Sequence, residues 1–319
     1  MDIFKLTLSQ MLMMFFLIAV GFLLRKKNVL PVNAHVTLSK AETNIFTPAL
    51  SMYSMITKCT VENFAQNWQL MLYGLILCLA AIGAAYLISR FFVKKEKRDS
   101  YERNLYKYAL TFGNFGFMGN FIILGIFGED VFFKYVLFTF FISILCNSWG
   151  LYVLIPKDQG TGLWKKLKKG LLTTPLIALL IGIILGMVGA QNFLPAFMLN
   201  ALESAGKCQG PVAMVLAGLV IGGYRFKETF TNKKVYVVSL LRLTLIPAGM
   251  MLAMHLLGAS KELMTLALVC FATPIGLNTI VFPAAYGGET KTGASMAMIS
   301  HLLSVVTLPL MYLLFIEVL

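Results

Sequence analysis

Charged side chains are scarce in this sequence, at 13% of its 319 residues against 58% hydrophobic residues. A soluble domain of this length needs a larger polar surface, so the composition excludes a water-soluble protein and predicts one that crosses a membrane several times. The charges are also unbalanced, with 27 Lys and Arg against 14 Asp and Glu. Because the basic residues lie mostly in short loops between apolar runs, they predict an orientation in the membrane and no nucleic-acid partner.

The sequence also lacks the residue patterns of common catalytic sites. It contains no H-E-x-x-H, no G-x-S-x-G, no P-loop and no carboxylate cluster that would hold a metal. Its five cysteines are scattered without a C-x-x-C pair, and they predict neither a metal site nor a disulfide. We therefore expect no enzyme, no ATP-driven pump, no cofactor and no bound metal.

Two apolar segments, residues 106–130 and 269–289, carry helix-breaking residues at their centres. The interruptions are Gly113, Asn114, Gly116, Gly119 and Asn120 in the first segment, and Pro274, Gly276, Asn278 and Pro283 in the second. In hydrocarbon an unpaired backbone group is costly, so broken helices survive only where they are buried in protein or line a cavity. The interruptions therefore predict an internal polar site.

The spacing of the interruptions predicts where this site lies. Gly116 and Gly276 are 160 residues apart, about half of the chain. Interrupted segments at corresponding places of two halves are typical of a transporter site between structural repeats. The alternative for the two asparagines is a structural amide that caps a half-helix. The candidate substrate-binding residues are Gly113, Asn114, Gly116, Pro274, Gly276 and Asn278.

Two ionisable residues inside apolar runs are candidates for charge or coupling. His301 follows Lys291 by ten residues, which places it about 15 Å into the membrane by helix rise. It is either a neutral imidazole bonded to a backbone carbonyl or a proton sensor. Arg242, about 12 Å deep, either snorkels as an anchor or sets a positive potential for an anion. Structural pairing is expected for two further sets, Glu203 with Lys207 and Lys40 with Glu42.

Ten apolar runs are near or above the roughly 20 residues that cross a bilayer. Nineteen Lys and Arg follow odd-numbered runs and four lie on the opposite side, so both termini are predicted outside. Because five runs per half is an odd number, the second half is expected to be inverted. We predict a first repeat at 1–155, a cytoplasmic linker at 156–170 and a second repeat at 171–319. The runs are 6–24, 32–57, 68–92, 106–130, 131–155, 171–190, 195–223, 235–258, 263–286 and 292–318.

Seven stretches, taken in order, resemble the auxin efflux carrier family of membrane transporters, and the likeness covers nearly all of the chain. They are VGFLLRKKNVL, LSKAETNIFTPAL, GNFGFMG, GPVAMVLAGLVIGG, LLRLTLIP, TPIGLN and ASMAMISHLLSVVTLPL. The resemblance implies ten transmembrane helices in two inverted five-helix repeats, with crossed broken helices 4 and 9. It also implies a scaffold from helices 1, 2, 6 and 7, often a dimer interface, and a transport domain from helices 3–5 and 8–10.

The resemblance can be carried over residue by residue. Asn114 matches the asparagine of the family's first crossover, and Pro274 with Asn278 matches the second. Asn120 and Phe121 stand where the family commonly has a proline after the first crossover glycine, and His301 stands where span ten usually has a small hydroxyl residue. The substrate or the coupling is therefore expected to differ from that of better-known members.

The sequence thus predicts an all-α integral membrane protein of the plasma membrane. Its expected function is secondary transport of a small organic anion, such as malate, malonate or an auxin-like acid, by alternating access. Proton coupling and uniport are both left open. The alternatives are a sodium-coupled organic anion symporter and, from another class, a membrane receptor for a small carboxylate. The expected partners are the anion, the lipid bilayer and a second copy through the scaffold helices.

Overall fold

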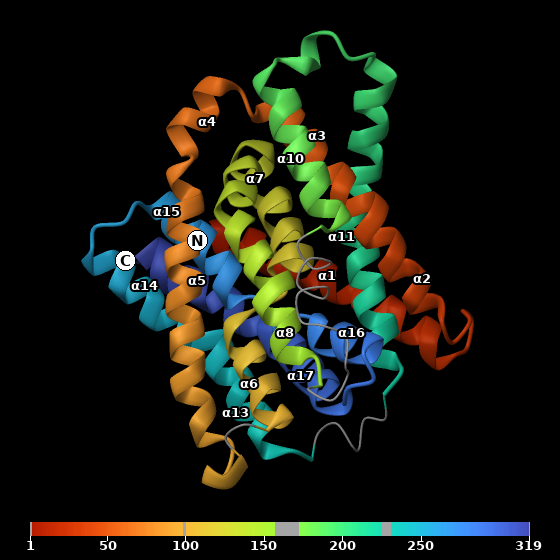
Figure 1. Cartoon of the computed structure of the whole chain (residues 1–319), viewed down its shortest axis with the longest axis vertical. Helices are drawn as coiled ribbons and strands as arrows, with labels where there is room; N and C mark the ends of the chain where they lie inside the picture. Colours follow the sequence, from red (N-terminus) through yellow and green to blue (C-terminus); the bar gives the residue numbers. More distant parts are fainter. Residues whose placement is uncertain (1, 98–99, 157–171, 225–230, 319) are drawn as a thin grey trace.

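The computed structural model describes residues 2–97, 100–156, 172–224 and 231–318 (Figure 1). Over these ranges the chain is helical and has no β-strand, so the all-α prediction is confirmed. The predicted linker at 156–170 lies, apart from its first residue, outside the described ranges. The described helices pack together into one bundle (Figure 1).

Polar residues start and interrupt the helices of the first half. Thr60 and Ser100 start α4 and α6, because each side chain accepts a hydrogen bond from the backbone N–H three residues later. Three π-helical turns, η1, η4 and η5, interrupt longer helices, and such turns are frequent at functional sites. The elements are α1 (Asp2–Lys26), α2 (Ala34–Ala41), η1 (Glu42–Phe46), α3 (Thr47–Lys58), α4 (Val61–Asn67), α5 (Gln69–Ile88), η2 (Ser89–Phe91), η3 (Lys95–Lys97), α6 (Tyr101–Thr111), η4 (Phe115–Gly119), α7 (Asn120–Leu145), η5 (Cys146–Gly150) and α8 (Leu151–Leu154).

Breaks also interrupt the helices of the second half. Ser260 starts α15 by accepting a hydrogen bond from the N–H of Leu263. α15 ends before Thr273, which is extended, and Pro274 follows with no N–H to continue a helix. The elements are α10 (Thr174–Met187), η6 (Ala190–Asn192), α11 (Ala196–Gly222), α13 (Lys233–Leu240), η7 (Leu241–Leu245), α14 (Ile246–Leu256), α15 (Lys261–Ala272), α16 (Asn278–Ala285), α17 (Lys291–Tyr312) and η8 (Leu313–Val318).

Six helical stretches of the described chain are long and apolar enough to cross a membrane, and α10 is a shorter apolar helix. The longest stretch is two helices, because Gly128 has φ 79° and ψ −173°, a conformation that glycine adopts most readily. Other predicted spans consist of shorter pieces, such as α2 with η1 and α3, or α15 with α16. The chain is therefore a multi-pass membrane protein. The six stretches are Phe4–Lys26, Val61–Phe91, Phe115–Leu154, Ala196–Gly222, Lys233–Leu256 and Lys291–Val318.

Glycines allow helices from the two halves to approach very closely. A Cβ atom added to Gly21 would lie 2.1 Å from the carbonyl oxygen of Val215, and one added to Gly218 would lie 2.0 Å from that of Ile18. α1 therefore meets α11 backbone to backbone, as membrane helices do where small residues line their contact. α10 meets α3 in the same way at Gly186.

The helices form two groups by their contacts. The first group contains α1, α2, α3, α10 and α11, in which α11 touches α1, α2 and α3, and α10 touches α3. The second group contains α5, α6, α7, α13, α15, α16 and α17. The groups touch where α1 meets α7 and α17, where α3 meets α7, and where α11 meets η4, α7 and α17. We refer below to the first and the second helix group.

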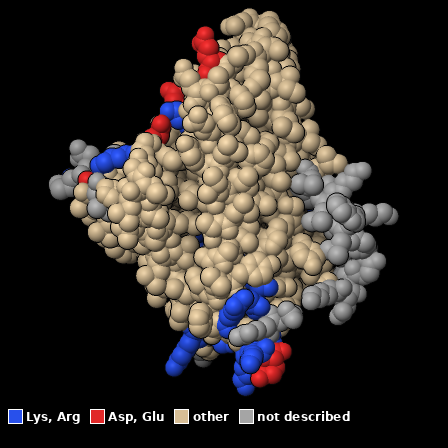
Figure 2. Space-filling model, turned by 60° about the vertical axis from the view of Figure 1, so that its left-hand side comes forward, with Lys and Arg blue, Asp and Glu red and all other residues tan. Residues whose placement is uncertain are grey.

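Large apolar side chains cover much of the outer surface of the bundle. Phe16, Ile76 and Ile184 are 61–69% exposed. On the face shown in Figure 2, a broad band almost free of charge separates charged upper and lower ends. An apolar surface of this kind is suited to contact with lipid tails, because the tails form no hydrogen bonds.

Candidate functional site

The two predicted interruptions meet inside the protein. α6 and α15 both end just before them, and the chain that follows each helix is extended. Gly113 and Ile275 form an antiparallel bridge, and the backbone N–H of Asn114 donates to the carbonyl oxygen of Pro274 at 2.7 Å. We call this region, residues 112–116 and 273–277, the crossover. The two segments of the crossover are about 160 residues apart in the sequence, yet they are in direct contact.

Buried side chains complete the hydrogen bonds of the crossover backbone. This is required at membrane depth, because no water is present there to satisfy a broken helix. Three such bonds come from three different helices. They are Tyr135 Oη to the Phe115 carbonyl at 3.1 Å, the Ile275 N–H to Ser300 Oγ at 3.0 Å, and Gln209 Nε2 to the Gly116 carbonyl at 3.3 Å.

Close packing explains two of the glycines at the crossover. A Cβ atom on Gly113 would lie 2.5 Å from Thr273 Oγ1, and one on Gly276 would lie 3.1 Å from the Gly113 carbonyl oxygen. Gly116 differs, since a Cβ atom there would meet nothing within 4 Å. Gly113 and Gly276 therefore permit the crossing of the two segments, whereas Gly116 borders open space.

That open space is a cavity of about 870 Å³ between the two helix groups. Its volume lies within the roughly 300–1,000 Å³ that is typical of small-molecule sites. Residues of α2, η1, α3, α10 and α11 form one wall, and residues of the crossover, α7 and α16 form the other. Of the six predicted substrate-binding residues, all except Pro274 line it, namely Gly113, Asn114, Gly116, Gly276 and Asn278.

The described lining of the cavity favours a negatively charged ligand. It includes Arg25, His35 and Lys40 and no Asp or Glu. In addition, η4 and α16 begin at the cavity, since Phe115 and Asn278 belong to its wall. The first turn of a helix has unpaired N–H groups and a partial positive charge, so both helix starts favour an anion.

Uncharged polar groups and apolar groups complete the lining. The polar groups are amides and hydroxyls, including Asn120, Thr139, Ser143 and Asn147. The apolar groups include leucines of α10 and α11 and Phe282 of α16. A cavity of this composition can hold both the carboxylate and the hydrocarbon part of a small organic acid.

His301 contacts Asn114 and does not line the cavity. Its Nδ1 atom lies 2.7 Å from the carbonyl oxygen of Ala297, and its Nε2 atom lies 3.3 Å from Nδ2 of Asn114. Because a carbonyl oxygen only accepts hydrogen bonds, Nδ1 carries the proton, and in the neutral ring Nε2 accepts from the amide. His301 thus fixes the direction in which the Asn114 side chain points.

Arg242 lies behind the crossover, on the side away from the cavity. It is fully buried in the π-helical turn η7, so its side chain does not snorkel to the surface. Nη1 donates to the carbonyl oxygen of Phe271, next to the last residue of α15, while Nε and Nη2 have no hydrogen-bond partner among the described residues. A cation at a helix C-terminus is stabilising, so Arg242 supports the end of α15 beside the crossover.

Two other predicted pairs have different outcomes. Lys207 and Glu203 form the expected ion pair, with Nζ 2.5 Å from Oε1. The expected pairing of Lys40 with Glu42 is wrong, because Lys40 is exposed whereas Glu42 is buried and accepts a hydrogen bond from Thr47. Residues two apart on a helix point to different sides, so this pairing was never geometrically available.

Sequence reasoning missed several residues of the site. Arg25, His35 and Lys40 line the cavity, although Arg25 and His35 lie near the ends of predicted runs and Lys40 was expected to pair with Glu42. Gln209 was also missed, although an amide inside an apolar run is a signal that could have identified it. The cavity wall assembles from helices far apart in the sequence, and no local pattern shows such an arrangement.

The fold and the site define a class of protein: a multi-pass, all-helical membrane protein whose broken helices cross beside an internal polar cavity. A family model described as "Membrane transport protein" matches residues 6–163 and 162–312 of the chain. This chain therefore belongs to that family of membrane transport proteins, and the predicted resemblance to the auxin efflux carriers is confirmed.

Two relatives agree with this assignment. The chain is 25% identical over 287 residues to "Uncharacterized transporter YfdV" of Escherichia coli (strain K12), which covers 85% of this chain and 86% of the relative. It is also 25% identical over 245 residues to "Uncharacterized transporter MJ1031" of Methanocaldococcus jannaschii, covering 74% and 75%. The family and both relatives are described as transporters.

Proposed function

We propose that this protein is a secondary carrier that moves a small organic carboxylate across the membrane by alternating access. The observation that carries the proposal is the cavity beside the crossover, whose described lining has three basic side chains and no acidic one. The starts of η4 and α16 add positive potential from their backbone N–H groups, without a charged side chain. Asn114, oriented by His301, is the amide that would donate to the carboxylate.

The proposed architecture has ten spans in two inverted repeats. Broken helices 4 and 9 would correspond to α6 with η4 and α7, and to α15 with α16. The first helix group would then be the scaffold and the second the transport domain. The separate packing of the two groups, with the cavity between them, supports this division. A homodimer through the scaffold would leave the second group free to move.

The position of the cavity supports a proposal for the side of the membrane toward which it opens. It extends from the crossover to Arg25, His35 and Tyr224, where α1 and α11 end. These ends precede loops that carry many Lys and Arg, which the positive-inside rule places in the cytoplasm. The conformation described here would therefore be the inward-facing state, and both termini would lie outside.

Transport by the purified protein tests this proposal. After reconstitution in liposomes, uptake of labelled malonate, malate and indole-3-acetate is measured with and without a pH gradient or sodium. We expect protein-dependent uptake of at least one acid, and competition by the same unlabelled acid. Empty liposomes and labelled neutral sugars or amines serve as controls. Tight binding of an acid without any uptake would instead favour a receptor, and uptake of amines alone would overturn the anion assignment.

A further inference from the structure

Glu42 is a buried carboxyl group that Gln209 connects to the crossover. It is the first residue of the π-helical turn η1 and none of it is exposed. Its Oε1 atom accepts a hydrogen bond from Thr47 Oγ1 at 3.3 Å. The side-chain amide of Gln209 on α11 also contacts this carboxyl group. The other carboxyl oxygen of Glu42, Oε2, has no hydrogen-bond partner among the described residues.

No cation faces this carboxyl group from the described helices packed against η1. On α2, His35 bonds the carbonyl oxygen of Val32, and Lys40 is exposed. On α11, Lys207 is exposed and pairs with Glu203. On α3, the charged residue is Lys58, which lies at the far end of the helix and pairs with Asp130. The remaining helix, α10, carries no charged residue.

This environment stabilises the neutral form of Glu42. A buried carboxylate loses its hydration, and without a cation and with one oxygen unpaired it has too few hydrogen bonds and no ion pair to offset that loss. A protonated carboxyl group avoids most of this cost, because it carries no net charge. The described conformation therefore favours a proton on Glu42.

Two contacts connect Glu42 to the transport machinery. Thr47, whose hydroxyl bonds the carboxyl group, lines the cavity. Gln209, on the other side of the carboxyl group, donates to the carbonyl oxygen of Gly116, which also lines the cavity. Gln209 belongs to the first helix group and Gly116 to the crossover, so this hydrogen bond spans the boundary between the groups. A movement of one group against the other must change it.

We propose that Glu42 is a proton-binding site that couples proton movement to transport. When the crossover moves, the Gln209 bond to Gly116 breaks, water reaches the carboxyl group past Thr47, and the proton passes to that water. When the two groups return to the described arrangement, Glu42 takes a new proton from water on the opposite side of the membrane, so one proton crosses in each cycle. This coupling role rests on the proposed carrier function, but the binding of a proton by Glu42 does not.

Infrared spectroscopy of the purified protein tests proton binding directly. At pH 7 the wild type is expected to show the absorption of a protonated carboxylic acid that Glu42→Gln lacks. Glu203→Gln is the matched control and should retain it, because Glu203 forms an ion pair with Lys207 at 2.5 Å, whereas Glu42 has no cationic partner among the described residues. Thr47→Val keeps the carboxyl group but removes its hydroxyl partner, so the absorption should move to higher frequency. An identical spectrum in the wild type and Glu42→Gln, or no shift in Thr47→Val, would overturn the proposal.

Transport in liposomes tests the coupling. Across a gradient of one pH unit, a carrier that moves one proton with each monoanion can accumulate it about tenfold. We expect the wild type to approach this ratio and Glu42→Gln to reach only equal concentrations on both sides. Accumulation by Glu42→Gln like that of the wild type would exclude coupling through Glu42. If the wild type moves none of the labelled acids, the proposed function fails, and the infrared comparison still decides whether Glu42 binds a proton.

Discussion

Lys58 Nζ lies 2.7 Å from Asp130 Oδ1 and thereby joins the last residue of α3 to the chain just after the break at Gly128. The contact links the first helix group to the second. Lys58 is eighteen residues beyond Lys40, a distance of about 27 Å by helix rise, so the pair lies far from the cavity end marked by Lys40. The basic residues of the cavity lining thus lie at one end, and an ion pair bridges the two helix groups toward the other.

Breaking the Lys58–Asp130 pair is expected to favour opening at that end. Exposed ion pairs contribute about 0.2–1 kcal/mol, so Lys58→Gln should shift the balance of the two conformations about 1.4- to 5-fold. The measurement is the rate at which a cysteine at Ser51, in the cavity wall, reacts with an impermeant thiol reagent added from the Lys58 side.

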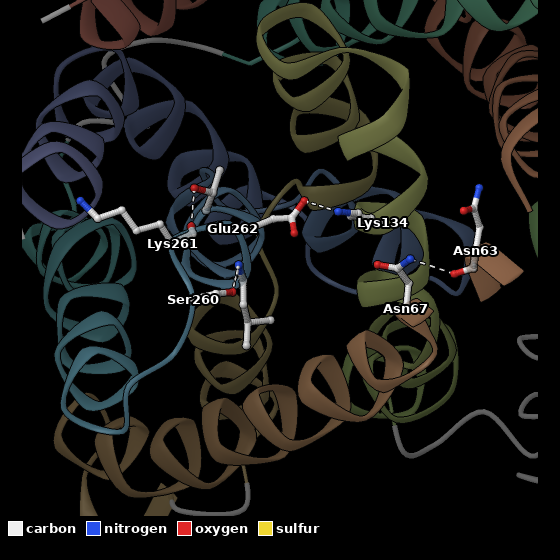
Figure 3. Close-up of polar contacts among 8 residues, drawn as sticks. Asn63, Asn67, Lys134, Ser260, Lys261 and Glu262 are labelled. Atoms are coloured by element: carbon white, nitrogen blue, oxygen red, sulfur yellow. Dashed lines mark hydrogen bonds and ion pairs between the residues drawn. The ribbon is translucent and has the colours of Figure 1, made fainter. Parts of the chain in front are cut away.

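A second ion pair provides the control for this experiment. Lys134 of α7 points to Glu262 of α15 at the same end of the protein, with Nζ 2.5 Å from Oε1 (Figure 3). Both helices belong to the second group, so Lys134→Gln should leave the labelling rate unchanged. Equal rates in Lys58→Gln and Lys134→Gln would contradict the role given to the first pair.

Replacing Asn114 by Ala is expected to weaken substrate binding in a protein that still folds. The backbone bond from Asn114 to Pro274 remains, but one donor to the carboxylate is lost. Such a bond to a charged group contributes about 1.5–3 kcal/mol, so affinity should fall roughly 10- to 150-fold. Calorimetry gives the affinity and the melting temperature. Asn147→Ala is the control, because the Asn147 amide already donates to the carbonyl oxygen of Ser143 in the preceding helical turn. A larger loss of affinity in Asn147→Ala than in Asn114→Ala would place the carboxylate near Asn147 instead.

Replacing His301 by Ala is expected to act through Asn114. It leaves the Asn114 amide without its partner, a loss of about 1–3 kcal/mol that should lower the melting temperature and, less strongly, the affinity. The pH profile of affinity between pH 5 and 8 should stay the same, because a buried ring without an anionic partner remains neutral. His301→Gln keeps an acceptor and should recover part of both losses. A normal melting temperature with a changed pH profile would instead identify His301 as a proton sensor.

Cysteine labelling can determine the orientation in the membrane. In a background without other cysteines, Lys261→Cys should react with an impermeant thiol reagent in intact cells. Lys27→Cys should react only after the cells are opened, because the residue follows α1 in a basic loop. The opposite result would reverse the proposed direction of the cavity while leaving the fold unchanged.

The broken helices were predictable because their residues conflict with their surroundings. Gly113, Asn114, Pro274 and Gly276 lie in apolar runs where a lipid-facing helix would have none of them. That the two segments cross was implied by the family resemblance, and the hydrogen bond between Asn114 and Pro274 agrees with it. Helix limits also agree closely, as for the predicted run 195–223 and the observed α11, Ala196–Gly222.

The polar surroundings of the crossover were much less predictable. The sequence marks Glu42 as a charge in an apolar run, but not that Gln209, more than 160 residues later, stands against it. Arg242 was equally ambiguous, since its depth permits both anchoring and an electrostatic role. These roles depend on which face each helix turns inward, and a helix that is apolar nearly all round gives little information about its orientation.

The glycine contact between α1 and α11 has a consequence for how this protein is made. Lys26, which ends α1, and Ala196, which begins α11, are separated by 170 residues. A ribosome adding about 5–20 residues per second needs roughly ten to thirty seconds to reach from one to the other. During that time α1 resides in the bilayer with Gly21 against lipid, and its permanent neighbour has not been synthesised. Neither half can mature alone, and the final assembly step of the protein must wait for its seventh apolar run to be inserted.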